Sequence, residues 1–362
     1  MVHLSTLLAG VVGLVTVVSA HPGHDVKIEA AERAVALKGM RARGLSQCTT
    51  TLKDRGVEAA NVARRDSMLR DIRKKRGLTG PVLKARDTAP LSTSHASDLA
   101  VDFDTDPSEL FASGGTCVLA EDVTQGPYYV SGELIREDLT EDQEGVPLYF
   151  DIQLIDSNSC EVVPDVYIDF WHCNSTGVYS GVVAGGNGNS ADESNIDTTF
   201  LRGLQKTDSL GVAQFETLFP GHYTGRATHI HVLSHPNGTT ANTNNDTLSG
   251  LYTASSSHVG QIFFDQDLIS LVEETAVYLT NTQQLTTNAE DSILLQELDD
   301  DIDPFIEYVL LGEDVSDGIF GWVNVVVDST KSTDVSPAVY YTEDGGVVNE
   351  NSSGGPGGAP SS

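Results

Sequence analysis

Basic residues are scarce over most of this 362-residue sequence. Only five of its 21 Lys and Arg residues lie in residues 101–362, against 43 Asp and Glu residues in the same stretch. Nucleic acids and anionic membranes are bound by basic surfaces. We therefore expect no nucleic-acid partner and no membrane partner, and the net charge of −31 favours solubility.

Long apolar runs are missing too, with one exception at the start of the sequence. Residues 7–18 are predominantly apolar and end at Val18, Ser19 and Ala20, a small-x-small pattern typical of signal-peptide cleavage. We expect residues 1–20 to be a signal peptide and the protein to be secreted and extracellular. Four Asn-x-Ser/Thr sequons predict a glycoprotein, at Asn174, Asn237, Asn245 and Asn351.

Cysteine is also rare, with four residues and no C-x-x-C pair that would suggest a zinc site. In an exported protein, four cysteines allow two disulfides in three connectivities. Cys160 and Cys173 lie at the ends of neighbouring strand-like runs. We predict that these two pair and that Cys48 pairs with Cys117.

The N-terminal part differs in composition from the rest of the chain. Residues 26–76 are rich in Ala, Glu, Lys, Arg and Leu and contain no proline, which predicts two or three helices. Residues 21–78 are therefore a basic helical segment, either a propeptide removed at its basic pairs or an arm packed on the acidic body, and we favour the arm. Residues 79–116 are expected to be a linker or wrapping arm.

Strand-like patterns dominate beyond residue 117. Apolar and polar residues alternate in residues 150–154 and 166–170, and a further strand is expected at 212–218. Short alternating strands with turns about every eight to twelve residues are typical of a β-sandwich. We predict a mainly β fold, with a β-sandwich over residues 117–345, an N-terminal helical segment, irregular loop-rich arms and a disordered tail over residues 346–362.

The residues best suited to chemistry are concentrated in residues 220–231, PGHYTGRATHIH. His229 and His231 belong to a strand-like run, and a period of two turns both imidazoles to one face, roughly 7 Å apart at their backbones. Two such imidazoles can bind one metal ion. Tyr223 lies in the turn before the strand, and Arg226 comes three residues before the first histidine.

Two further motifs accompany this stretch, WHCNSTGVY at residues 171–179 and TDSLG at 207–211. Together with PGHY and RATHIH, they resemble the intradiol ring-cleavage dioxygenases, and more narrowly the secreted fungal extracellular branch of that family. The clear match covers residues 117–264. The resemblance implies a β-sandwich and a non-haem Fe(III) ion, with Tyr223 and His231 as axial ligands and Tyr179 and His229 as equatorial ones.

The resemblance also implies an activity, the cleavage of a catecholic ring by O2 between its two hydroxylated carbons to give cis,cis-muconate-type products. Tyr223 would leave the metal and accept a substrate proton, and Arg226 would stabilise negative charge near the ring. Gln261 would be a polar residue near the substrate. The substrate mouth would be lined by Pro127, Tyr128 and Tyr129. The partners implied are a small aromatic diol and O2, and a homodimer stays open.

The donor set itself favours ferric iron. Hard anionic oxygen ligands stabilise Fe(III) over Fe(II). Free tyrosine has a pKa of about 10, so only a strong Lewis acid keeps two phenolates at neutral pH. Trp171 is interpreted as a core residue. Three other histidines are not expected to bind the metal: His172, His222 and His235.

Two other functions stay open. An inactive β-sandwich binding module would share the fold without the chemistry, although four ligands in order and Arg226 argue against it. If cleavage follows Ala20, His21 would present an amine and an imidazole that suit copper, as in secreted copper monooxygenases. Colour separates the three, because Fe(III) tyrosinate absorbs visible light.

Overall fold

The computed structural model describes residues 48–80, 107–111, 116–118, 126–189, 191–242, 244–250, 255–299 and 303–352. The predicted signal peptide, His21 and most of the predicted linker lie outside the described residues. Within these ranges the protein is mainly β-structure with a short N-terminal helical part, as predicted.

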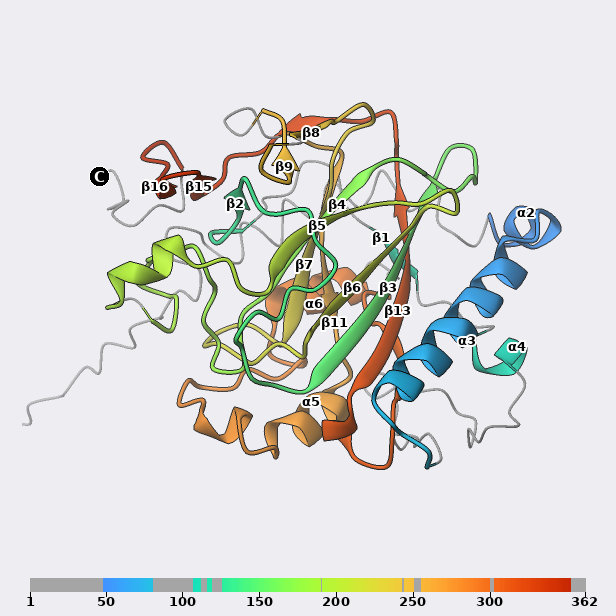
Figure 1. Ribbon diagram of the computed structural model, residues 1–362, viewed down its shortest axis with the longest axis horizontal. Coiled ribbons are helices and arrows are strands. Elements are labelled where there is room, and N and C mark those ends of the chain that lie inside the picture. Colours follow the sequence, from blue (N-terminus) through green and yellow to red (C-terminus); the bar gives the residue numbers. More distant parts are fainter. Residues whose placement is uncertain are drawn as a thin grey trace, which may run out of the picture.

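Two packed sheets form the body of the molecule (Figure 1). Sheet A has the order β1-β13-β3-β6, with β12 paired to β13. Its strands are β1 (Thr116–Val118), β3 (Pro147–Asp156), β6 (Val212–Leu218), β12 (Glu307–Leu310) and β13 (Ile319–Val327). Sheet B has the order β11-β7-β4-β5. Its strands are β4 (Tyr167–Trp171), β5 (Arg202–Lys206), β7 (His229–Ser234) and β11 (His258–Phe263).

The core between the sheets is built from the apolar face of each strand. Phe150 and Ile152 of β3 pack with Ile168 and Phe170 of β4, and all four are fully buried. Because side chains alternate along a strand, the outer face of sheet B carries the residues in between. That outer face therefore presents Asp169, Trp171, His229 and His231.

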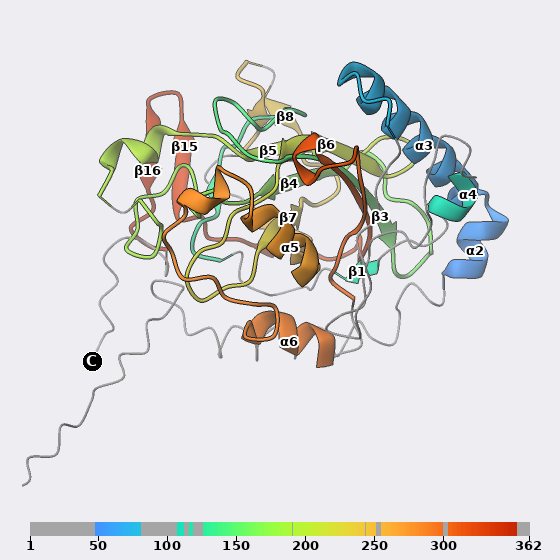
Figure 2. The same ribbon diagram turned by 90° about the horizontal axis from the view of Figure 1, so that it is seen from below.

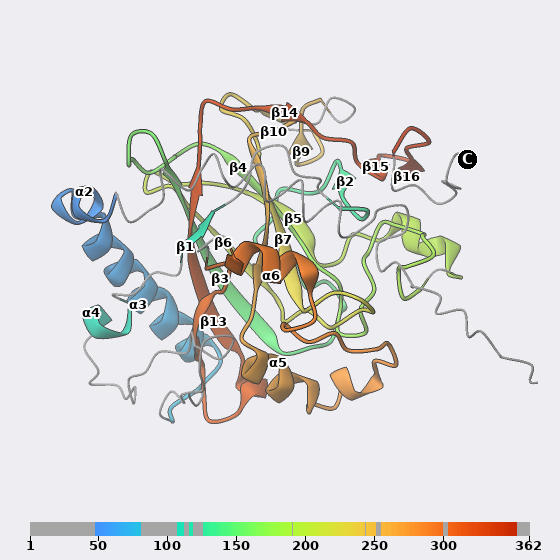
Figure 3. The same cartoon turned by 180° about the vertical axis from the view of Figure 1, so that it is seen from behind.

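A helical arm covers the outer face of sheet A. Helices α2 (Thr49–Asp54) and α3 (Val57–Lys75) lie beside β3 and β13 in Figure 1 and, from behind, in Figure 3. Leu69 and Ile72 of α3 pack against Phe320 and Trp322 of β13. Helix α4 (Pro107–Leu110), inside the predicted linker, adds Leu110 to the same cluster.

A buried ion pair fastens this arm to the sheet. Asp151 of β3 accepts hydrogen bonds from Arg64 at 2.9 and 2.8 Å and from Arg65 at 3.0 Å. Gln214 donates a further hydrogen bond to Asp151 at 3.0 Å. Burial alone would raise the pKa of Asp151, but the hydrogen bond from Arg64 and the charges of Arg65 and Arg64 outweigh it and lower the pKa to about 2.

We expect Asp151→Asn to reduce the free energy of unfolding by about 3–5 kcal/mol, because it leaves the buried Arg65 and the partly buried Arg64 without their counter-charge. The parent should lose part of this stability in acid, about 2.6 kcal/mol from the shift of the Asp151 pKa. A depressed carboxyl pKa stabilises the fold above the unfolded value of about 3.9, and the contribution disappears as pH falls through the folded value of about 2. Urea unfolding of the parent and of Asp151→Asn, measured from neutral pH down to about pH 2, measures both effects. Asp165→Asn, at an exposed ion pair with Lys206, is the control and should change stability little.

The disulfide prediction is wrong. Cys48 pairs with Cys160, across a sequence separation of 112 residues, and Cys173 is a buried free thiol. Cys160 lies in the turn after β3, next to α2, whereas Cys173 follows the far end of β4. The length of β4 therefore separates the two cysteines that we expected to pair. The disulfide instead joins the helical arm to the sandwich.

Shorter elements complete the fold. The helical ones are η3 (Glu193–Asp197), α5 (Gln266–Glu273), η4 (Tyr278–Thr280), α6 (Ser292–Asp299) and η5 (Val315–Asp317). The short strands are β2 (Val130–Ser131), β8 (Ala241–Asn242), β9 (Thr247–Leu248), β10 (Ser255–Ser256), β14 (Thr333–Asp334), β15 (Val339–Thr342) and β16 (Gly345–Val348). Figure 2 shows α5 and α6 from below. Among the described residues, none of the helices has the length and apolar character that a membrane span requires.

The predicted tail begins too early. Residues 345–348 form β16, which pairs with β15, and β15 pairs in turn with β2. Asn349 is buried and donates a hydrogen bond to the carbonyl of Pro337 at 2.8 Å. β16 forms a hairpin with β15, and contacts with distant segments hold this hairpin, namely the pairing of β15 with β2 and the hydrogen bond from the Gly346 amide to Asp197. The local composition does not show these contacts. The remainder of the predicted tail, residues 353–362, lies outside the described residues.

Candidate metal centre

Two tyrosines and two histidines converge on the outer face of sheet B. The Nε2 atoms of His229 and His231 are 3.1 Å apart, and the Tyr223 hydroxyl lies 3.3 Å from His229 Nε2. The Tyr179 ring faces Tyr223 and His231, with centroids 5.6 and 5.9 Å away. All four side chains are buried. The structure thus brings together the four residues that the resemblance assigns to iron.

The two tyrosines come from loops that touch backbone to backbone. A Cβ on Gly177 would lie 2.2 Å from the carbonyl oxygen of His222, and one on Gly221 would lie 2.4 Å from that of Ser175. Gly177 also has φ +77°, a left-handed conformation that favours glycine. Both glycines are therefore required for the Tyr179 loop to lie against the Tyr223 turn.

Two asparagines hold the backbone of Tyr179. The Asn187 side chain accepts a hydrogen bond from the Tyr179 amide and donates one to the Tyr179 carbonyl, both at 2.8 Å. Asn195 donates to the same carbonyl at 2.8 Å. The polar, glycine-rich residues 185–194 have a composition typical of an exposed loop, but Asn187 is buried. The glycine-rich composition around it gave no signal of this role.

The imidazoles are held in defined orientations. His229 Nδ1 donates to the carbonyl of Ala227 at 2.6 Å, which leaves its Nε2 with a lone pair facing the centre. The His231 ring stacks on Trp171, with centroids 4.9 Å apart and an interplanar angle of 5°. Trp171 is buried, as predicted, and it also forms a wall of the centre. Gly126 also lies against His231, since a Cβ on Gly126 would be 3.3 Å from His231 Cε1.

Arg226 lies beside the centre as a buried, fixed cation. Its Nε donates to Asp291 at 2.9 Å, and its Nη2 donates to Gln261. Gln261 is paired with His231 in the β11–β7 register, so both predicted residues lie next to the centre. Burial would raise the pKa of Asp291, but the Arg226 charge and hydrogen bonds from backbone amides outweigh it and hold the pKa below its usual value.

Asp291 is a functional residue that sequence reasoning missed. Its Oδ1 accepts from the amides of Ile293 and Leu294, so it caps α6, while its Oδ2 accepts from Arg226. The capping role is visible in the sequence, because an aspartate precedes an apolar helical run. The pairing with Arg226, 65 residues earlier, is a tertiary contact that the local pattern does not contain.

The predicted substrate-mouth residues divide into two groups. Tyr128 stacks on Tyr179, with ring centroids 4.7 Å apart, and therefore borders the centre. Tyr129 instead packs on Trp171, at 5.1 Å. Pro127 is buried in the same segment. Tyr129 is thus separated from the four-residue centre by the Trp171 ring.

Three other histidines are bound elsewhere, as expected. His172 Nε2 lies 2.8 Å from the Thr217 hydroxyl, and burial lowers its pKa to about 4. His222 Nδ1 lies 2.7 Å from Glu273. His235 Nε2 lies 3.4 Å from Asp169.

The centre fits a strongly Lewis-acidic ion. Burial raises the pKa of Tyr179 well above that of free tyrosine, and the neighbouring Tyr223 adds to this. Burial also raises the pKa of Tyr223, although the Arg226 charge opposes it. The buried Tyr179 hydroxyl has no hydrogen-bond partner of ordinary geometry. Phenols in this setting ionise only beside a strong Lewis acid, which the donor set suits.

The described residues contain no cluster of three or more His, Cys, Asp or Glu side chains arranged for a metal ion. The centre contains only two residues of these types, His229 and His231. Its other two candidate ligands are phenols, which makes it distinct from zinc sites and from sites with two histidines and one carboxylate.

No protein-family model matches the sequence, and no curated protein does. The chain is similar to the solved intradiol ring-cleavage dioxygenase from Tetranychus urticae, at 29% identity over 59% of this chain and 96% of that one, with a TM-score of 0.46. It is also similar to hydroxyquinol 1,2-dioxygenase from Pseudomonas putida DLL-E4, at 16% identity over 58% and 66% of the two chains, with a TM-score of 0.36. Both TM-scores are below 0.5, so the proposed function rests on the residues of the centre and not on these structures.

Proposed function

We propose that this protein is a secreted non-haem Fe(III) intradiol dioxygenase that cleaves catecholic rings with O2. The observation that carries the proposal is the convergence of two buried phenols and two buried imidazoles, with the Nε2 atoms of His229 and His231 3.1 Å apart and the Tyr223 hydroxyl 3.3 Å from His229. Tyr179 completes the set. Bound Fe(III) would supply Lewis acidity and accept electron density from the catecholate ring.

The protein's residues would then handle protons and charge. Tyr223 Oη, as a phenolate, would accept a proton from a catechol hydroxyl and so become a neutral phenol. Arg226 is held rigidly by Asp291, so its positive charge is in place before negative charge develops on the reacting ring. Tyr128 and Trp171 form apolar walls that exclude water from the reacting atoms.

The reaction balances without another reactant. One catechol and one O2 give one dicarboxylic acid, because the bond between the hydroxylated carbons breaks and each of these carbons receives one oxygen atom. Substrates to be compared are catechol, hydroxyquinol and protocatechuate. The product from catechol would be cis,cis-muconate.

Secretion is part of the proposal. It is supported by the signal-like sequence of residues 1–20 and by the Cys48–Cys160 disulfide, a bond that persists in oxidising compartments. The Asn174 side chain is engaged within the protein, because it donates to Gln143 and accepts from the amides of Thr176 and Val178. We therefore expect higher glycan occupancy at the other three sequons than at Asn174.

Turnover of catechol under ¹⁸O2 tests the activity. We expect O2 uptake in equal amount to catechol consumed and a ring-opened diacid that carries both labelled atoms. An aldehyde product would indicate cleavage outside the diol, and iron-loaded protein that consumes no O2 with any of the three catechols would support the inactive binding module instead.

A further inference from the structure

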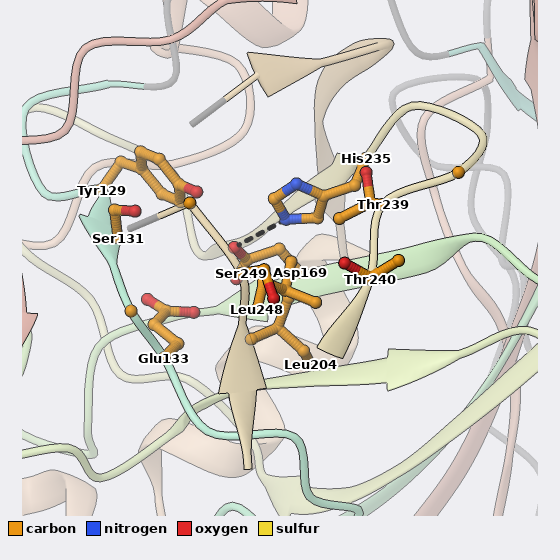
Figure 4. Close-up of a pocket in the computed structure, with 13 residues that line it drawn as sticks. Tyr129, Ser131, Glu133, Asp169, Leu204, His235, Thr239, Thr240, Leu248 and Ser249 are labelled. Carbon is orange, nitrogen blue, oxygen red and sulfur yellow. Dashed lines mark hydrogen bonds and ion pairs between the residues drawn. The ribbon is translucent and has the colours of Figure 1, made fainter. Parts of the chain in front are cut away.

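A polar cavity, separate from the metal centre, lies on the outer face of sheet B. Its volume is about 220 Å³. Figure 4 shows Tyr129 and Glu133 on one side and His235, Thr239 and Thr240 on the other. The cavity is distinct from the centre, because the rings of Tyr129 and Trp171 stand between it and His231.

Two buried carboxyl groups line this cavity. Glu133 and Asp169 are only 4% and 2% exposed. One oxygen of each is accounted for, since Glu133 Oε1 accepts from Arg202 at 3.1 Å and Asp169 Oδ2 lies 3.4 Å from His235. The two carboxyl groups also hydrogen-bond each other, and the Tyr129 hydroxyl donates to Asp169. Among the described residues, Glu133 Oε2 and Asp169 Oδ1 have no hydrogen-bond partner outside this group of three side chains.

The charges around Glu133 and Asp169 do not balance both carboxylates. Arg202 is the guanidinium that contacts Glu133, and its other hydrogen bonds go to the carbonyls of Tyr128 and Ser180 and to the Ser180 hydroxyl. When His235 is neutral, Arg202 is the one cation facing two carboxyl groups, and a proton shared between Glu133 and Asp169 balances the second charge. Consistent with this, burial and then the Asp169 charge raise the pKa of Glu133 well above its usual value.

The remaining walls indicate the chemistry of a ligand. Thr239 and Thr240 lie across the cavity from Glu133, and Ser249 lines it beside Asp169 (Figure 4). The Thr239 hydroxyl donates to the carbonyl of Pro236 at 2.8 Å, so its lone pairs can accept a hydrogen bond from a ligand. Within the described residues, no three-residue His, Cys, Asp or Glu cluster suits a metal ion. An organic cation with hydroxyl groups fits these walls better than a metal does.

We propose that this cavity binds a small hydroxylated organic ammonium compound, with the ammonium group between Glu133 and Asp169. The ligand's N–H groups donate to Glu133 Oε2 and Asp169 Oδ1, and its charge takes the place of the shared proton. The ligand's hydroxyls contact the threonine wall. A cavity of about 220 Å³ holds a molecule the size of one sugar ring, below the roughly 300 Å³ at which drug-sized pockets begin.

Calorimetric titration of the purified protein with glucosamine, at neutral pH, tests the proposal. The matched control ligand is N-acetylglucosamine, which has the same ring but no ammonium charge. We expect saturable binding of glucosamine and at least roughly tenfold weaker binding of the acetylated sugar, a difference of about 1.4 kcal/mol or more. Equal binding of the two sugars, or no binding of glucosamine, overturns the proposal.

Three variants localise the binding. Asp169→Asn should weaken glucosamine binding at least tenfold, and Thr240→Trp should do the same by narrowing the mouth at an exposed position, without touching the buried carboxyl pair. Glu137→Gln removes an exposed carboxylate in the same segment as Glu133 and should change nothing. Glucosamine binding that survives Thr240→Trp, or a saturable calcium titration that displaces glucosamine, contradicts an ammonium site. Because these readouts need no catechol turnover, they are independent of the proposed dioxygenase activity.

Discussion

Tyr223→Phe is expected to lower catechol turnover by about 10² to 10⁴ while most of the bound iron is retained, because it removes a positioned base but leaves three other ligands. The Tyr223 hydroxyl lies 3.3 Å from His229 Nε2, so in the proposed centre it would both bind the ion and receive a proton. Steady-state kinetics with metal analysis on the same preparation measures both quantities. The visible absorption should also weaken, because one of two phenolates is lost.

Two comparisons make this result specific. Tyr179→Phe should reduce iron retention more than it affects the proton transfer, since Tyr179 is the more rigidly held phenol, with its backbone fixed by Asn187 and Asn195. Tyr149→Phe, on sheet A against the helical arm, should leave iron and turnover unchanged. Near-normal turnover of Tyr223→Phe would show that Tyr223 is not the base.

Asp291→Asn should have the second largest effect, on both stability and turnover. The Asn amide can cap α6 through its oxygen, but its NH2 group then faces the Arg226 guanidinium, donor against donor. We expect a loss of about 3–5 kcal/mol in the free energy of unfolding, because a buried charge loses its partner. Turnover should fall by about 10- to 100-fold, as is usual when a supporting residue of a metal site is removed.

The matched control is Asp314→Asn, at the exposed cap of η5, where the aspartate accepts from the Ser316 amide at 2.8 Å and binds no arginine. That variant should change stability by about 1 kcal/mol at most and turnover not at all. If Asp291→Asn behaves like Asp314→Asn, then Asp291 is only a helix cap. Urea unfolding and kcat together distinguish these outcomes.

The β-sandwich could be predicted because its pattern is local. Residues 150–154 and 166–170 alternate, and the structure places their apolar members between the two sheets and their polar members on the outer faces, where other segments bury them. The same period of two placed His229 and His231 on one face. In contrast, the burial of Asp151 could not be predicted, because it depends on a helix that starts almost 100 residues earlier in the sequence.

The parts of the site that sequence reasoning missed depend on contacts that composition and periodicity do not show, and most of these contacts are long-range. Asn187 holds Tyr179 from a loop whose composition indicates only exposure, and Asp291 reaches Arg226 from the cap of α6. The error over Cys160 has the same origin, since its partner Cys48 belongs to a segment whose docking the strand pattern does not specify. Glu133 and Asp169 likewise meet only in the folded chain.

The most direct test of the proposed centre is the visible absorption spectrum of the purified protein, recorded with its metal content. We predict a single ferric ion per chain and a broad visible charge-transfer band from tyrosinate to Fe(III), which weakens in both Tyr179→Phe and Tyr223→Phe. Full occupancy by zinc or copper with no visible band, or an iron band that neither substitution changes, would contradict the assignment of Tyr179 and Tyr223 as ligands.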